Sequence, residues 1–186
     1  MVPLASLWLP ILVSAVFVFV ASSVIHMALK YHHSDYSKVP SEDEVMEAMR
    51  KFSIPPGDYF MPRAEGSAEM KSPEYKKKAE RGPVVVFTVI GKDGFAMGKR
   101  LFQWFVYIVF VSLFAGCVAA GMIGPGAPYR VVFHVVAMVA FAGYALALWQ
   151  TSIWYKRPWG TTFRTTVDGL IYGCLTAGTF GWLWPK

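Results

Sequence analysis

Charged residues are scarce in this chain. Asp, Glu, Lys and Arg make up 16% of its 186 residues, whereas they make up about 25% of an ordinary soluble domain. Hydrophobic residues account for 55% and aromatic residues for 16%. The charges are also unevenly placed, because residues 31–100 hold 23 of the 30. This distribution argues against a water-soluble globule and predicts hydrophobic blocks around one polar insert.

The chain also lacks the motifs of the common enzyme classes. It has no Walker loop, no Gly-x-Ser-x-Gly elbow, no His-Glu-x-x-His helix and no Cys-x-x-Cys-His haem attachment. A haem held by two histidines within the bundle is disfavoured as well, because His26 and His134 are predicted near opposite ends of it. The two cysteines, Cys117 and Cys174, differ in predicted depth by roughly 13 Å, which disfavours a disulfide. We therefore expect no bound cofactor.

Four apolar stretches are long enough to cross a bilayer, which takes about 20 helical residues. They lie at residues 7–30, 101–123, 131–154 and 167–184. We therefore predict an all-α membrane protein with four transmembrane helices and a small α+β cytoplasmic insert between the first two. The organisation is then a first transmembrane helix at 1–30, the insert at 31–100 and a three-helix transmembrane region at 101–186.

Basic residues predict the orientation. With four spans, one side of the membrane carries 16 Lys and Arg and the other carries 2, and cytoplasmic loops are the ones enriched in these residues. Both termini are therefore predicted to be periplasmic and residues 31–100 cytoplasmic. All seven Trp fall near predicted span ends, as in interfacial belts. The insert has 12 basic and 11 acidic residues, so the net charge of +6 does not indicate a nucleic-acid partner.

The insert carries signals for short helices. Ser41 and Glu44 match a capping box that opens an amphipathic helix, which Pro55 ends. A second helix is predicted to start at Ser72, with Pro73 in its first turn, and to end at Gly82.

The insert also carries signals for strands. The β-branched and aromatic run at 84–90 predicts a strand, with a turn at 91–94. Residues 58–61 are its predicted partner. Together the two runs would make a very small sheet.

Histidines cluster at the end of the first predicted span. His26, His32, His33 and Asp35 are metal-ligand types, and they form the candidate metal site. In a continuous helix, however, His26 and His33 lie about 10 Å apart along the axis. The alternative is a set of interfacial histidines that contact lipid headgroups or nearby backbone.

Small residues repeat along the fourth predicted span. Gly169, Gly173, Ala177 and Gly181 recur every four residues and so line one face, which favours close helix packing in lipid. The partner is left open between the second helix and another subunit. Asp168 begins this predicted span, where it would complement the helix dipole and pair with Arg164 or Arg157.

Ionisable groups are rare at mid-membrane, where transporters usually place them or break their helices. The polar residues predicted there are mainly hydroxyl-bearing: Ser14, Ser112, Tyr144, Thr176 and Thr179. A small-solute carrier remains one hypothesis, and it predicts a water-filled cavity near Tyr144 and Thr176.

Several motifs resemble a family of small bacterial inner-membrane proteins with four helices and no established activity. They are Trp8-Leu9-Pro10, Ser22-Ser23-Val24-Ile25-His26-Met27, Pro56-Gly57-Asp58-Tyr59, Ala96-Met97-Gly98-Lys99 and the closing run Thr176-Ala177-Gly178-Thr179-Phe180-Gly181-Trp182-Leu183-Trp184-Pro185. The resemblance covers nearly the whole chain. It implies a bacterial inner-membrane location, and it supplies no catalytic residue.

The leading functional hypothesis is therefore a multi-pass integral membrane protein without enzymatic activity. It would act as a structural or accessory subunit through helix association and its insert. Its expected partners are the lipid bilayer and either other membrane subunits or a second copy. The alternative is a metal-binding membrane protein or oxidoreductase that uses the cluster at His26, His32, His33 and Asp35.

Overall fold

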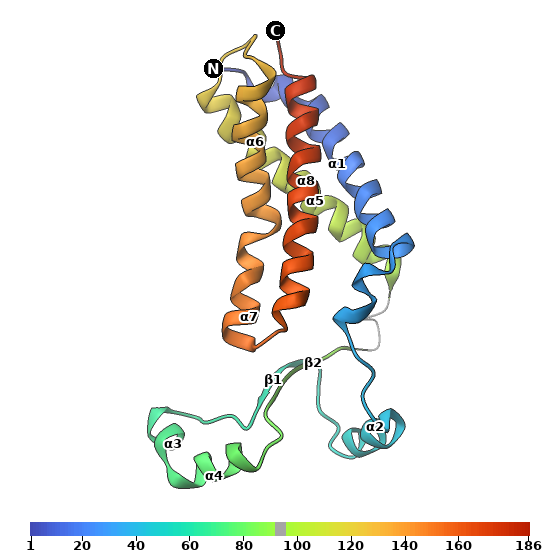
Figure 1. Ribbon diagram of the computed structural model, residues 1–186, viewed down its shortest axis with the longest axis vertical. Coiled ribbons are helices and arrows are strands. Elements are labelled where there is room, and N and C mark those ends of the chain that lie inside the picture. The colour runs from blue at the N-terminus through green and yellow to red at the C-terminus, as the bar shows by residue number, and fades with distance from the viewer. Residues whose placement is uncertain (92–95) are drawn as a thin grey trace. The chain divides into compact units, whose positions relative to one another are not determined.

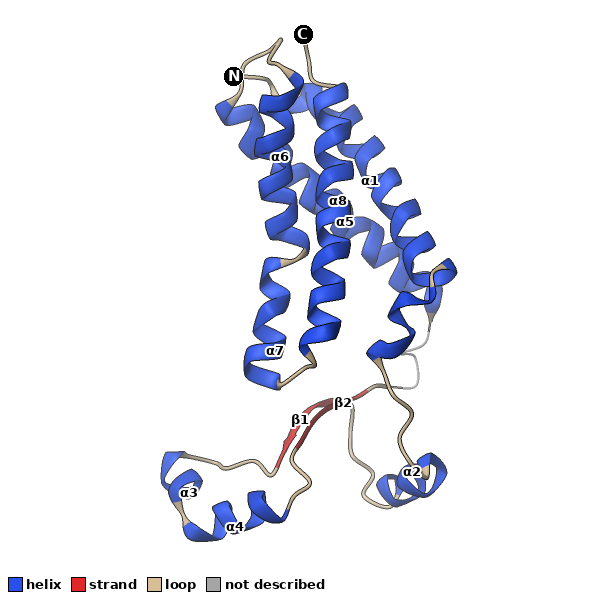
Figure 2. Ribbon diagram, in the orientation of Figure 1, coloured by secondary structure: helices blue, strands red, loops and turns tan. Residues whose placement is uncertain are grey.

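The computed structural model describes residues 1–91 and 96–186 (Figure 1). The chain forms two compact units. One, the bundle, comprises Met1–Ser37 and Met97–Lys186, and the other, the insert, comprises Lys38–Ala96. Most of the described residues are helical, and the two strands among them lie in the insert (Figure 2).

The bundle is built from long helices with short helical turns at their ends. Its elements are η1 (Leu4–Leu7), α1 (Trp8–Ser23), the π-helical η2 (Val24–Ala28), the 3-10 segment η3 (Lys30–Asp35), α5 (Met97–Met122), α6 (Tyr129–Tyr144), η5 (Leu146–Leu148), α7 (Trp149–Tyr155) and α8 (Trp159–Trp182). Three helical segments within the described residues are long and apolar enough to cross a membrane: Leu4–Ala28, Met97–Met122 and Tyr129–Tyr155. These match three of the four predicted spans.

The fourth long helix, α8, differs from the predicted span at 167–184. It starts at Trp159, eight residues earlier, and its first half carries several threonines, Arg164 and Asp168. That polar half explains why α8 is not among the three apolar segments. The prediction of a fourth span therefore stays a prediction.

The insert contains α2 (Glu42–Arg50), β1 (Gly57–Met61), α3 (Ser67–Lys71), α4 (Pro73–Arg81) and β2 (Val85–Val89). The strands pair antiparallel, with Gly57 opposite Val89 and Met61 opposite Val85, which confirms the predicted sheet. The Ser72 hydroxyl accepts a hydrogen bond from the Tyr75 N–H at 3.1 Å, which confirms that helix start.

Two predictions for the insert are not confirmed. The capping box is wrong, because Ser41 adopts a left-handed conformation with φ of 48° and its side chain makes no cap hydrogen bond. The helix that follows is nevertheless present. The predicted turn at 91–94 lies largely outside the described residues.

Two clusters of buried side chains make the core of the bundle. The terminal half, near the chain ends in Figure 1, contains Leu7, Ile11, Ala115, Ala119, Val132, Val136, Ala177 and Phe180. The distal half contains Ala15, Val18, Ile25, Ile108, Val111, Ala140, Tyr144 and Tyr172. A buried Ser14–Ser112 hydrogen bond of 3.1 Å lies where the two halves meet.

The small-residue face of α8 packs on α6 of the same chain. A Cβ added to Gly169 would lie 2.7 Å from Ala145 Cβ, and one added to Gly173 would lie 3.2 Å from the Phe141 backbone N. Ala177, on the same face, is fully buried. The predicted close-packing face is thus present. Its partner is α6, which differs from both partners considered from the sequence.

Candidate functional site

The site begins with a change of helix type after α1. The chain passes through the π-helical η2, an extended residue at Leu29 (φ −89°, ψ 132°) and the 3-10 segment η3. This change brings the rings of His26 and His32 together, stacked with centroids 4.6 Å apart and planes 10° apart. In one continuous α-helix these positions would point about 120° away from one another.

His32 is held between two carboxylates. Its Nδ1 lies 2.6 Å from Asp35 Oδ2, and its Nε2 lies 2.8 Å from Asp168 Oδ2. Tyr31 donates from its hydroxyl to Asp168 Oδ1 at 2.5 Å. Arg164 donates from Nε and Nη2 to Asp35 Oδ1 at 2.8 and 2.5 Å. We call these five residues the His32 network; it ties η3 to α8.

The centre of the network is buried. The side chains of His32, Asp35 and Asp168 are 11%, 7% and 4% exposed. Both ring nitrogens of His32 face carboxylate oxygens, and Asp35 also accepts from the positively charged guanidinium of Arg164.

Protonation states at the edge of the network follow from its hydrogen bonds. Burial raises the pKa of Asp35, but the hydrogen bonds from His32 and Arg164 outweigh it and hold that pKa below its ordinary value. Burial and the hydrogen bond to Asp168 raise the pKa of Tyr31 above its ordinary value. Asp35 is therefore an ionised acceptor and Tyr31 a protonated donor.

Three metal-ligand side chains converge here. One ligand atom each from His26, His32 and Asp168 lies within 4.8 Å of the others. His26 Nδ1 lies 3.0 Å from the Ser22 carbonyl oxygen, which leaves its Nε2 for another partner.

The structure brings together only part of the predicted histidine cluster. Of its four members, His26 and His32 come together as candidate ligands. Asp35 lies behind His32 as its hydrogen-bond partner, and His33 is exposed and outside the group. The third candidate ligand, Asp168, was absent from the predicted cluster.

The interpretation of Asp168 as a residue at the helix start is wrong. Asp168 is the tenth residue of α8, well beyond the first turn, where a carboxylate complements the helix dipole. It pairs with His32 and Tyr31, while Arg164 pairs with Asp35. The signal that could have identified it is an acid in an apolar stretch, which marks a functional site in membrane proteins.

A second polar feature lies deeper in the distal half. The hydroxyls of Tyr144 and Tyr172 are buried and have no hydrogen-bond partner within the described residues. Leaving such a group unpaired costs about 1–3 kcal/mol. Their neighbours are paired: Tyr107 donates to the Gly143 carbonyl at 2.6 Å, and Trp104 Nε1 donates to the Ser22 hydroxyl at 2.9 Å.

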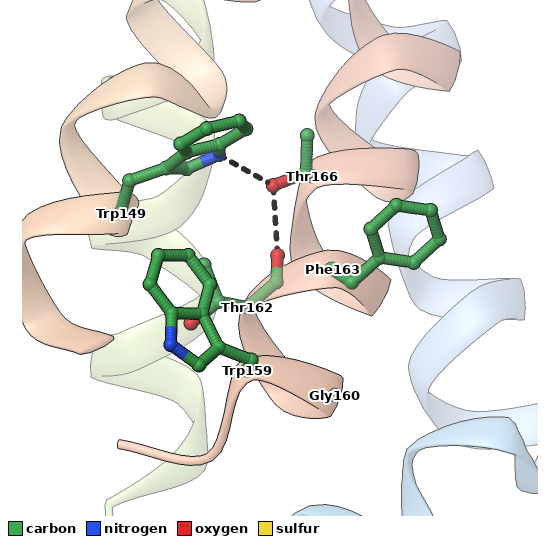
Figure 3. Close-up of a pocket in the computed structure, with 6 residues that line it drawn as sticks. All are labelled: Trp149, Trp159, Gly160, Thr162, Phe163 and Thr166. Atoms are coloured by element: carbon green, nitrogen blue, oxygen red, sulfur yellow. Dashed lines mark hydrogen bonds between the residues drawn. The ribbon is translucent and has the colours of Figure 1, made fainter. Parts of the chain in front are cut away.

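A surface pocket opens between α7 and α8 (Figure 3). It has a volume of about 360 Å³ and is lined by Trp149, Trp159, Gly160, Thr162, Phe163 and Thr166. Trp149 Nε1 donates to the Thr166 hydroxyl at 3.0 Å, and that hydroxyl donates to the Thr162 carbonyl at 2.7 Å. None of the lining residues is ionisable, so the pocket offers no acid–base or metal chemistry.

Known proteins do not identify the site. The chain matches no protein-family model, no curated protein and no solved structure. Membership of the bacterial family suggested by its motifs therefore stays a prediction. The function has to be argued from the geometry around His32.

Proposed function

We propose that this chain is a multi-pass integral membrane protein that binds one divalent transition-metal ion through His26, His32 and Asp168. The observation that carries the proposal is the convergence of these three side chains, with their ligand atoms within 4.8 Å of one another. The three apolar helical segments support the membrane part of it.

The distances are close to those of a coordination site. In a tetrahedral site with bonds of about 2.0 Å, neighbouring ligand atoms lie about 3.3 Å apart. The contact between His32 Nε2 and Asp168 Oδ2 is 2.8 Å, so it would open by about 0.5 Å to admit an ion. His26 is the exposed member of the group.

The surroundings are those that a metal-binding histidine needs. Such a histidine nearly always donates its other ring N–H to a carboxylate or a backbone carbonyl, which fixes its orientation. Asp35 is placed to play this part for His32, and the Ser22 carbonyl to play it for His26. Arg164 in turn holds Asp35 in place.

The ligand types define the class of ion. Two imidazoles and one carboxylate suit Zn²⁺ and Fe²⁺ and leave coordination positions open for water or substrate. With a redox-inactive ion the site would handle the metal or activate water, and with iron it would serve an oxidoreductase. The identity of the ion thus separates the two forms of the metal-binding hypothesis.

Metal titration of the full chain, purified in detergent and stripped with a chelator, tests the proposal. We expect one equivalent of Co²⁺ or Zn²⁺ to bind, with visible absorption bands from the cobalt form. His26→Ala, His32→Ala and Asp168→Asn should each abolish stoichiometric binding. His33→Ala is a matched control, because His33 lies next to His32 in sequence but outside the ligand group.

An indirect effect is expected at Asp35. Asp35→Asn removes the carboxylate behind His32 and should weaken metal affinity about 10- to 100-fold while the stoichiometry stays at one. Absence of stoichiometric metal in the unmodified chain would reject the proposal. An equal loss of binding in His33→Ala and His32→Ala would also reject it, because binding would then not depend on the geometry described above.

The hypothesis that the chain is an accessory subunit is supported by fewer observations than metal binding is. The small-residue face of α8 is covered by α6, so association with another subunit would need a different face. The 16-to-2 distribution of basic residues supports an orientation with both termini periplasmic and the insert cytoplasmic. Together with this orientation, we propose a location in a bacterial inner membrane.

A further inference from the structure

Polar side chains follow one face of α8 inward from the His32 network. Asp168, Tyr172 and Thr176 are spaced four residues apart, so they lie one above another on the helix, and all three are buried. This polar face spans about 12 Å along the helix. It ends at Thr176, beside Ala177 of the terminal half.

Two groups along this face have unmet hydrogen-bonding capacity. Tyr144 and Tyr172 are 7% and 4% exposed, their ring centroids lie 5.6 Å apart, and neither hydroxyl has a partner within the described part of the chain. The Tyr144 hydroxyl lies near the side chains of Ser112 and Thr176. Tyr172 lies within electrostatic reach of Asp168.

We propose that the Tyr144 and Tyr172 hydroxyls bind internal water. Buried water typically bridges polar groups that would otherwise be unsatisfied, and hydroxyls from α5, α6 and α8 converge here. The bound water continues the hydrogen bonds of Asp168 inward to the Ser14–Ser112 pair. This site does not depend on metal binding, because Asp168 is its neighbour with or without an ion.

The surroundings of the water site become more apolar toward the terminal half. Beyond Ser14, Ser112 and Thr176, the buried hydrophobic side chains of the terminal half are aliphatic, with Phe180 and Trp184. The buried hydroxyl of Thr179 donates to the Leu175 carbonyl oxygen of its own helix at 2.8 Å. The bound water therefore lies between Asp168 and the Ser14–Ser112 pair. The site hydrates the surroundings of a buried carboxylate.

Radiolytic hydroxyl-radical footprinting of the full chain tests this proposal. Radicals form from bound water inside a protein, so a buried ring beside water is oxidised although bulk solvent does not reach it. Tyr144 and Tyr172 should be modified several-fold faster than Phe180. Phe180 is the internal control, because it is fully buried in the terminal half. Equal modification of all three rings would overturn the proposal.

Tyrosine-to-phenylalanine variants give a second readout and should fold, since the ring is kept. If the hydroxyls share water, Tyr144→Phe and Tyr172→Phe should each lower the melting temperature. The double variant should then lower the melting temperature by less than the sum of the decreases in the two single variants. If the hydroxyls are unpaired, each variant should instead melt at a higher temperature, which would overturn the proposal. Tyr107→Phe calibrates the assay, because its hydroxyl has a known partner.

Discussion

The two halves of the bundle are held together by different interactions. In the terminal half, Leu7, Val132, Val136 and Phe180 are fully buried and make van der Waals contacts. In the distal half, the His32 network supplies hydrogen bonds and charge pairs, and the buried hydroxyls of Tyr144 and Tyr172 have no partner within the described residues. The comparison separates an apolar half from a half that contains the candidate site. The buried carboxylate of Asp168 and the two unpartnered tyrosine hydroxyls lie in the second.

Phe180→Ala should give the largest loss of stability. Phe180 is among the largest fully buried side chains, and truncating a buried Phe costs about 3–5 kcal/mol. Thermal unfolding in detergent measures the loss. Phe114→Ala is the control, because Phe114 is 66% exposed on α5. Metal stoichiometry should survive Phe180→Ala in the fraction that remains folded. A loss of metal binding there would break the division between the halves.

Gly173→Leu should have the next largest effect. A Cβ at Gly173 meets the Phe141 backbone at 3.2–3.4 Å, so α6 and α8 must separate, and such overpacking typically costs about 1–3 kcal/mol. Gly121→Leu on α5 is the matched control, because nothing lies within 4 Å of its added Cβ. If the two variants unfolded at the same temperature, the α6–α8 contact would not limit stability. A change of oligomeric state without a change of stability would instead point to a face used between subunits.

Ser112→Ala should have the smallest effect. The variant removes the buried hydrogen bond between Ser14 and Ser112, and such bonds between membrane helices average about 0.6 kcal/mol. We expect a small drop in melting temperature and unchanged metal affinity. A drop as large as that of Phe180→Ala would show that the boundary between the halves carries more of the stability than the comparison assigns to it.

The sequence predicted the features that depend on local pattern. Apolar length gave three of the spans, the β-branched run gave β2, and four-residue spacing gave the small face of α8. The sequence did not predict the two helix breaks at Leu29 and Ala145. No proline or glycine follows Ala28 to signal the turn at Leu29, and the third predicted span is interrupted at Ala145, where Gly169 packs against it. Such breaks depend on contacts between distant helices.

Two of the three candidate ligands were predicted, for the same reason. Histidines near a span end are visible in the sequence, and so His26 and His32 were found. The identity of the third ligand depends on which residue of α8 faces η3. The starting point of α8 lies eight residues before the predicted span, so Asp168 was assigned to a helix end that it does not occupy.

The His32 network also constrains how the protein is made. The contact between Arg164 and Asp35 joins residues 129 positions apart in the chain, and the contact between His32 and Asp168 joins residues 136 apart. During synthesis, η3 is therefore complete long before its partners on α8 exist. Until then the carboxylate of Asp35 and the ring of His32 are without those partners and are open to solvent or chaperones. The network closes only when α8 is in place, so its formation reports that the bundle has been completed.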